Sequence, residues 1–385
     1  MKRSVSALYS PYVIDGVQMD YTPAQMLDDC MPAGTRSTEQ NPGTYDSIVD
    51  EITDPTPKKT VYDRESVTAY LDRIMEIKDN VPHNAAHYPK SYTRRKIAGE
   101  LISALWKKGH FTLEDLKLDA GWKWDNVPLG NMAAFYFSAE AASQYIFGLG
   151  IRLESYSFVK SSGSSDVEFR VNADVTKDEE AENEYDFFNE QEAGEPHYCW
   201  MADDAKCGNK LIGDPDSWLI YIPFDTCSFR LGDSLLERAA GVSGDKAPSV
   251  QDPDYFIDCF EVVRELIEDG VIISGTTVGP GGLAAAAASM CGDYGIKIDI
   301  SGIGRAAGEA DPVRILFSEI PGVLVQIRDD DYDYIDSQML LQDIAYFPLG
   351  HPVPDSGFGI LQGRHPGVSD ILASLVLGHC SEGED

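Results

Sequence analysis

The segment from Tyr255 to Ile327 constrains the fold more than any other part of this chain of 385 residues. Between Tyr255 and Gly270, apolar residues recur at three- and four-residue steps, which predicts an amphipathic helix that ends at the glycine. The elements predicted after it are, in order, a strand at Val271–Ser274, a glycine-rich turn at Thr276–Gly282, an alanine-rich helix at Leu283–Met290 and a strand at Gly295–Ile300. This order predicts an α/β or α+β layer.

The N-terminal half shows similar periodicity. Helices are predicted from Asp63 and over Tyr92–Lys108, each with one apolar face. Met132–Ile146 is a strongly apolar helix with small residues on one side, and Ile151–Val159 then alternates like a strand. Residues 1–60 are rich in Asp, Thr, Pro and Gly with weak periodicity, so we expect an extended arm that packs on another subunit or domain.

The charge of the chain argues against two classes of function. With 31 basic and 64 acidic residues, the formal charge of −33 argues against binding nucleic acid or an anionic membrane through a general electrostatic patch. A nucleotide can still bind, because backbone N–H groups, a local Lys or Arg and Mg2+ all hold phosphates. Solubility or adaptation to salt explains the acidity without a functional role.

Cysteine usage and hydropathy bear on location. The seven cysteines are scattered and never spaced as Cys-x-x-Cys, which predicts neither a disulfide framework nor a zinc site and fits a reducing cytoplasm. The chain has no apolar run of 18 residues, and its basic N-terminus lacks an apolar core. We therefore expect neither a membrane span nor a signal peptide.

Arg94, Arg95 and Lys96 form a basic cluster at the start of the helix predicted from Tyr92. Cations in a first turn oppose the helix dipole, so an anion or an acidic partner at this place would offset the repulsion. A solvated basic face is the alternative interpretation.

His83 and His87 are four residues apart, a spacing that could ligate a metal on a helix. Because prolines flank the pair, we predict loop or turn residues instead. Gly302–Ala307 imitates a dinucleotide fingerprint, but Asp311 and Pro312 follow too soon for the long helix that such a fingerprint needs.

Acidic residues gather in two places. Residues 178–195 contain nine acids and no base, which is typical of a solvated insertion. Asp203 and Asp204 follow an apolar run directly, and such a pair could hold Mg2+ against phosphates. The alternative is that both are exposed turn residues.

The C-terminal half resembles the aminoimidazole ribonucleotide synthetase superfamily, and within it the C-terminal domain of the phosphoribosylformylglycinamidine synthase family. The resemblance extends over residues 215–353. The elements that carry it are Trp218–Ile222 with Leu231–Ser234, Glu265–Gly270, Gly281–Ala284, Gly295–Ile300 and Leu316–Gly322 leading into Val323–Ile327. The small-residue helix Met132–Ile146 is similar to a helix of the N-terminal domain in that superfamily.

The resemblance implies a two-domain α/β to α+β fold, with an ATP-binding-type N-terminal domain and a C-terminal mixed sheet covered by helices. We divide the chain into an arm at 1–60, an N-terminal domain at 61–212 with its acidic insertion at 178–195, a C-terminal domain at 213–360, and a helix with an acidic tail at 361–385. Because N-terminal domains of this superfamily pair through their sheets, the resemblance also implies a homodimer.

The same resemblance implies a nucleotide or phosphoribosyl ligand, with ATP and Mg2+ as cofactors. Asp203 and Asp204 would bind Mg2+, and the turn at Thr277, Gly279 and the pair Gly281 and Gly282 would receive a phosphate at the start of the alanine-rich helix. The reaction implied is an ATP-driven activation of an amide, as in purine biosynthesis.

The chain also departs from the family pattern. Where the synthases have His-Asp-Val-Ser-Asp-Gly-Gly-Leu, this chain has Thr-Thr-Val-Gly-Pro-Gly-Gly-Leu over Thr276–Leu283, without either aspartate. The Gly-Asp-Asp-Ala strand and a Cys-His-Glu glutaminase triad are also missing. A non-catalytic homologue that keeps the fold as a binding or structural protein is therefore the alternative, and an acidic protein that covers a basic partner surface is a third interpretation.

Overall fold

The computed structural model describes residues 5–32, 45–53, 63, 66–77, 84–173, 205–240 and 246–361. The elements of the N-terminal half are β1 (Tyr12–Ile14), β2 (Val17–Gln18), α1 (Pro23–Asp28), β3 (Ile48–Asp50), α2 (Val67–Ile77), α3 (Pro89–Ala104), the 3-10 turn η1 (Leu113–Asp115), β4 (Leu116–Asp125), α4 (Asn131–Gly148), β5 (Arg152–Ser161) and β6 (Asp166–Ala173). Those of the C-terminal half are β7 (Trp218–Pro223), α5 (Leu235–Ala240), α6 (Pro253–Glu268), β8 (Ile272–Val278), α7 (Gly282–Met290), β9 (Gly295–Ile298), α8 (Ser301–Ala307), α9 (Pro312–Phe317), β10 (Gly322–Ile327), the 3-10 turn η2 (Asp329–Asp331), α10 (Tyr332–Leu341), β11 (Phe347–Gly350), β12 (Pro352–Val353) and β13 (Phe358–Ile360).

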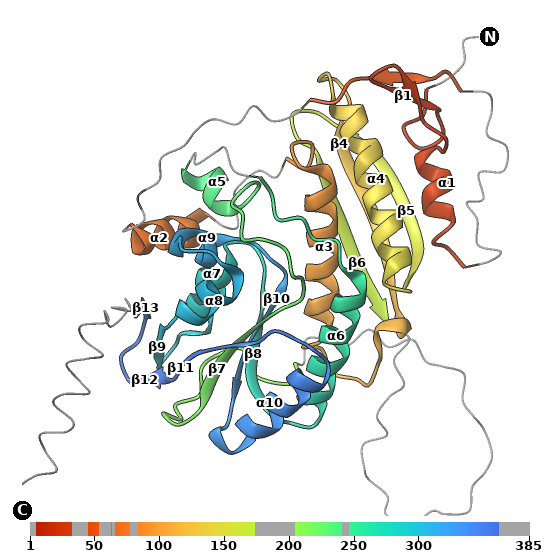
Figure 1. Ribbon diagram of the computed structural model, residues 1–385. Coiled ribbons are helices and arrows are strands. Elements are labelled where there is room, and N and C mark those ends of the chain that lie inside the picture. The colour runs from red at the N-terminus through yellow and green to blue at the C-terminus, as the bar shows by residue number, and fades with distance from the viewer. Residues whose placement is uncertain are drawn as a thin grey trace, which may run out of the picture.

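A four-stranded antiparallel sheet in the order β11-β7-β10-β8 forms the centre of the C-terminal half (Figure 1). Every residue of β10 is buried, because apolar clusters cover both faces of the sheet. Ile220 and Val325 belong to the cluster that α3, α4 and α6 fill, whereas Tyr221 and Leu324 belong to the one shared with α7 and α9. The mixed pairing expected for this half occurs in the small β12-β9-β13 sheet.

The N-terminal half is built on the mixed sheet β5-β4-β6, with α3 and α4 packed side by side against it (Figure 1). Buried polar contacts join these elements. The hydroxyl of Ser138 on α4 accepts a hydrogen bond from Nε1 of Trp122 on β4 at 2.8 Å and lies 2.7 Å from the hydroxyl of Thr93 on α3. Helix α3 also contacts β8 and β10, so it lies where the two halves meet.

The N-terminal arm packs on α4. Its strands form a small sheet in the order β2-β1-β3, and α1, β1 and β3 all contact α4. Asp50 at the end of β3 is 6% exposed and accepts hydrogen bonds from the backbone N–H groups of Gly130, Met132 and Ala133 at 2.8, 2.8 and 2.9 Å. A carboxylate from the arm therefore caps the N-terminus of α4.

Most helices predicted from periodicity are confirmed, namely α2, α4, α6 and α7. The prediction for α3 was wrong at its start, because the helix begins at Pro89, whose fixed φ angle suits the first helical position. Arg94 to Lys96 therefore lie in the second turn. Helix α8 ends after seven residues, which confirms that Gly302–Ala307 does not begin a long helix. Among the described helices, none combines the length and the apolar character that crossing a membrane requires.

The histidine pair is only half described. His87 lies in a bend before α3, with Nε2 3.2 Å from the side-chain amide nitrogen of Asn84, which confirms a loop position for this residue. His83 lies outside the described residues, as do the acidic segment 178–195 and the C-terminal residues 362–385. The boundary between the domains at residues 212 and 213 stays a prediction. Helix α2 lies before it in the chain yet packs against α5 and α7.

Candidate functional site

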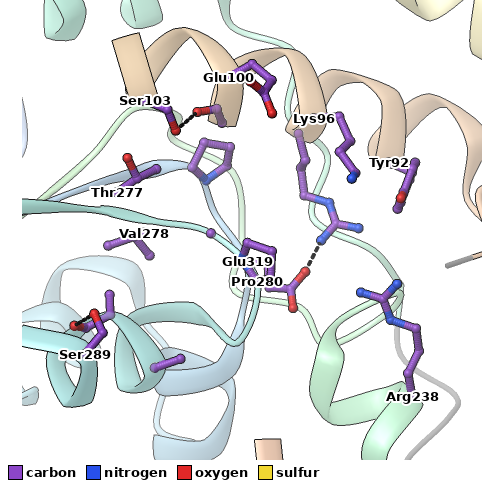
Figure 2. Close-up of a pocket in the computed structure, with 16 residues that line it drawn as sticks. Tyr92, Lys96, Glu100, Ser103, Arg238, Thr277, Val278, Pro280, Ser289 and Glu319 are labelled. Atoms are coloured by element: carbon purple, nitrogen blue, oxygen red, sulfur yellow. Dashed lines mark hydrogen bonds and ion pairs between the residues drawn. The ribbon is translucent and has the colours of Figure 1, made fainter. Parts of the chain in front are cut away.

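A cavity of about 340 Å3 lies between α3 on one side and the β8–α7 turn on the other. Figure 2 shows Lys96 and Glu100 entering it from α3, Arg238 from α5, and Thr277 and Val278 from β8. Small and apolar residues complete the wall, including Pro280, Ala285, Ala286 and Pro321. Alanines at two positions of α7 leave the space open, because a larger side chain there would fill it.

Three cations face this cavity in a chain of strongly negative charge. They are Arg95, Lys96 and Arg238. The ammonium group of Lys96 lies 5.5 Å from the ring centroid of Tyr92. Its charge also acts on Glu100 in the same cavity, where it opposes the rise in the pKa of that carboxyl caused by burial. Tyr92 donates to Asp166 at 2.5 Å, and its pKa is raised by burial and by that carboxylate, so the phenol stays protonated.

Arg95 differs from its neighbour because its charge is already neutralised inside the protein. Its guanidinium pairs with Asp233 at 2.5 Å and with Glu319 at 2.7 Å, and all three side chains are less than 10% exposed. Burial lowers the pKa of Arg95, but the two carboxylates outweigh it and the net shift is upward. Burial raises the pKa of Asp233 to about 6, although Arg95 opposes the shift.

The carboxylate of Glu319 accepts hydrogen bonds from three elements that form the cavity wall. Besides Arg95 of α3, its carboxylate accepts from the backbone N–H of Leu235 at the start of α5 at 2.6 Å and from that of Gly281 at 2.9 Å. These N–H groups belong to helix starts, where an anion is favoured. An internal carboxylate therefore stands at the beginning of the alanine-rich helix, where the sequence predicts a phosphate.

The N–H groups of Gly281 and Gly282 in the predicted phosphate turn donate to different acceptors. Gly281 donates to Glu319, and Gly282 donates to the carbonyl of Gly279 at 2.8 Å. Gly281 and Gly282 both have positive φ angles, +86° and +68°. A Cβ on Gly282 would also lie 2.6 Å from the carbonyl oxygen of Leu316, so this position requires glycine.

Gly279 and Thr277 are the predicted residues that line the cavity. A Cβ built on Gly279 meets nothing within 4 Å, so its backbone is open to a ligand. The prediction of a turn from Thr276 was wrong at its start, because β8 continues to Val278 and pairs there with β10. Thr277 is a strand residue whose hydroxyl accepts from Nε1 of Trp106 at 2.8 Å and keeps its own proton to donate.

The metal site predicted from the sequence consists of two aspartates. Asp203 and Asp204 lie outside the described residues, and their assignment to Mg2+ stays a prediction. In the part of the chain that the structure describes, no three side chains of His, Cys, Asp or Glu converge as a metal site. Burial raises the pKa of each of the five described cysteines, which disfavours the nucleophilic thiolate.

The sequence did not indicate that Arg95, Asp233 and Glu319 come together. Glu319 was visible only as part of the Leu316–Gly322 segment, and Arg95 only as part of a basic cluster. The two residues are 224 positions apart, so no local pattern links them.

Comparison with known proteins adds to this geometry. Residues 228–334 match the family model of the AIR synthase related protein, C-terminal domain. The probable chloroplastic/mitochondrial phosphoribosylformylglycinamidine synthase of Arabidopsis thaliana is 26% identical over 283 residues, which cover 70% of this chain and 18% of the relative. The human phosphoribosylformylglycinamidine synthase is 24% identical over 135 residues, which cover 34% of this chain and 10% of the relative. The chain thus spans less than a fifth of the length of these relatives.

A solved structure described as T. maritima PurL complexed with FGAR has a similar fold, with a TM-score of 0.52 and 13% sequence identity. The match covers 73% of this chain and 42% of that chain. It supports an α+β fold with two domains, which agrees with the arrangement of the two halves. Residues 228–334 are thus similar to the C-terminal domain of AIR synthase related proteins, and the curated relatives that the chain resembles are phosphoribosylformylglycinamidine synthases.

Proposed function

We propose that the cavity between α3 and α7 binds a phosphorylated small molecule, a nucleotide or a phosphoribosyl compound. The observation that carries the proposal is the gathering of Lys96, Arg238 and the open backbone of Gly279 around one space, in a chain of net charge −33. In so acidic a protein, cations that converge on a cavity are a specific feature and not a consequence of composition.

The two sides of the cavity suit the two parts of such a ligand. A phosphate would lie at the cationic side, beside the ammonium of Lys96 and the guanidinium of Arg238. The base or sugar would lie against Val278, Ala285 and Ala286, whose side chains are apolar. A volume of about 340 Å3 falls at the lower end of the range for small-molecule sites and suits a ligand of mononucleotide size.

The relatives support this class of ligand. The T. maritima PurL structure is a complex with FGAR, and the relatives from Arabidopsis thaliana and human are phosphoribosylformylglycinamidine synthases, the former a probable one. We carry the ligand class to this chain as a proposal, because the chain covers only part of each relative.

Two roles are open to a protein that binds such a ligand. In the first, the chain activates an amide with ATP, and Asp203 and Asp204 hold Mg2+. In the second, it keeps the superfamily fold as a non-catalytic binding protein. The position of Glu319 favours the second role, because its carboxylate already accepts from the N–H group of Gly281 that a phosphate at the start of α7 would use. The α7 turn does not fit a phosphate while that carboxylate is in place, so we derive no reaction step through ATP.

Thermal unfolding with and without ligand tests the binding proposal. AMP, Mg2+-ATP and formylglycinamide ribonucleotide would each be titrated into the millimolar range. A ligand at about a hundred times its dissociation constant adds roughly 2.7 kcal/mol to the free energy of unfolding. We expect Lys96→Gln to abolish this stabilisation and Lys123→Gln, at an exposed position of β4, to retain it. Failure of all three compounds to stabilise the wild-type chain would refute the proposal.

A second assay separates the two roles. Release of inorganic phosphate from ATP would be followed with formylglycinamide ribonucleotide and ammonium as the nitrogen donor. The binding role predicts no release above the rate without protein, even at concentrations that stabilise the fold. Release that disappears in Asp203→Asn or Asp204→Asn would establish the ATP-driven role instead.

A further inference from the structure

Arg94 lies on the other side of α3 from Arg95 and faces a second, larger cavity of about 610 Å3. This cavity is bounded by the starts of α3 and α4, by Ile52 and Thr53 of the arm, and by the segment at 246–251. The basic cluster identified in the sequence is therefore divided by the helix. Arg95 and Lys96 face the first cavity, and Arg94 faces the second.

The guanidinium of Arg94 has only neutral partners. It donates to the carbonyl of Val250 at 3.3 Å and to the side-chain oxygen of Gln144 at 3.2 Å, and its Nε is buried without a hydrogen-bond partner. No described carboxylate forms an ion pair with it, whereas Arg95 forms two. Burial lowers the pKa of Arg94, although Tyr145, Glu140 and Asp225 oppose the shift. Glu140 and Asp225 act on the guanidinium without an ion-pair contact, so an anion in direct contact would add the charge-assisted hydrogen bond that its Nε lacks.

A second cation on the cavity wall is already paired inside the protein. Lys90 enters it from the first turn of α3, where its ammonium pairs with Glu140 at 2.7 Å and lies 4.7 Å from the ring centroid of Phe137. Helix α3 has proline at its first position, and the side chain of its N-cap residue, Tyr88, makes no capping hydrogen bond. Helix α4 begins at the same cavity but is capped by Asp50.

We propose that this second cavity binds a small organic oxyanion, with its anionic group at Arg94 and its apolar part against Ala133, Ala134 and Phe137. The volume exceeds that of the first cavity, and these three side chains give it an apolar wall. The site is separate from the proposed nucleotide site, because the two cavities share no lining residue.

Tungstate, a tetrahedral oxyanion with a strong anomalous signal, tests the location in crystals of the full chain. We expect an anomalous peak within hydrogen-bonding reach of the Arg94 guanidinium. An anomalous map with no peak beside Arg94, from crystals soaked at millimolar tungstate, would overturn the proposal. This result does not depend on any variant folding.

Isothermal titration with inorganic phosphate tests the same site in solution. Arg94→Gln should weaken phosphate binding at this site about tenfold or more, because hydrogen bonds to charged groups are the strong ones. Arg94→Lys keeps the charge and should lose less affinity. Lys96→Gln is the matched control, since it alters the first cavity alone. Unchanged phosphate binding in Arg94→Gln would contradict the proposal, whatever Lys96→Gln does to the nucleotide site.

Discussion

The adjacent residues Arg94 and Arg95 lie on two sides of α3 and have different interaction partners. Arg95 forms ion pairs with Asp233 and Glu319 of the C-terminal half, whereas Arg94 donates hydrogen bonds to a carbonyl and to a neutral side-chain amide. Where the chain supplies the anions, the charges form a closed cluster that joins α3, α5 and the α7 turn. Around Arg94 the chain supplies carboxylates without an ion-pair contact, those of Glu140 and Asp225, and the guanidinium keeps a donor for a ligand. A buried cation therefore indicates a binding site only after its internal partners have been counted.

The largest expected effect comes from substituting the two arginines in parallel. Arg95→Gln leaves Asp233 and Glu319 buried beside each other without their cation, and we expect a loss of about 3–5 kcal/mol in the free energy of unfolding. Arg94→Gln removes a guanidinium with neutral partners and should cost about 1 kcal/mol or less. Urea denaturation measures both values. Equal losses of unfolding free energy in the two variants would show that the internal ion pairs of Arg95 do not distinguish it from Arg94.

Asp233→Asn tests the closed cluster through its pH dependence. The pKa of Asp233 is raised by burial from 3.8 to about 6, so the folded state holds this proton more tightly than the unfolded state does. Stability from this group is therefore present below about pH 4 and is lost as pH rises through 6. The wild type should lose on the order of 2 kcal/mol relative to the variant between pH 4 and pH 7. Parallel unfolding curves for both proteins across this range would contradict the assignment.

Asp50→Ala tests a second internal carboxylate, the one that caps α4. Three backbone N–H groups would lose their acceptor, and we expect a cost of about 1–2 kcal/mol, typical of a lost helix cap. Asp50→Asn keeps an acceptor oxygen and should cost less. Guanidinium denaturation compares the two. Alanine and asparagine variants of equal stability would show that the cap does not depend on the acceptor.

Lys96→Gln should have the smallest effect on stability, within about 0.5 kcal/mol, because the ammonium only lies over the ring of Tyr92 and acts on Glu100 through its charge. Its expected effect is on ligand binding alone. A thermal midpoint several degrees below that of the wild type without ligand would show that Lys96 belongs to the structural cluster and not to the open side of the cavity.

Local patterns predicted those elements whose periodicity is complete within one segment. The helix at Pro253–Glu268 and the alanine-rich helix at Gly282–Met290 are examples. The strand at Leu116–Asp125 was missed although its alternate residues Leu116, Leu118 and Ala120 are buried, a signal that the sequence does contain. Proline at position 89 likewise marked the start of α3.

The candidate site was less predictable because its contacts are not local. The glycine turn could be found from its composition, but the carboxylate that accepts from Gly281 lies 38 residues later, and its guanidinium partner lies 224 residues before that carboxylate. The division of Arg94 from Arg95 depends on the rotation of α3 between two sheets. Such a rotation follows from tertiary packing and not from the basic cluster itself.

The cap that Asp50 provides to α4 also has a consequence for the order of folding. Asp50 and Gly130 are 80 residues apart, so closing that loop costs more chain entropy than forming α4 against α3. We expect the arm to dock after the sheet and helices of the N-terminal half have formed. It should also detach first in native-state hydrogen exchange, so that the amides of Gly130, Met132 and Ala133 report release of the arm rather than global unfolding.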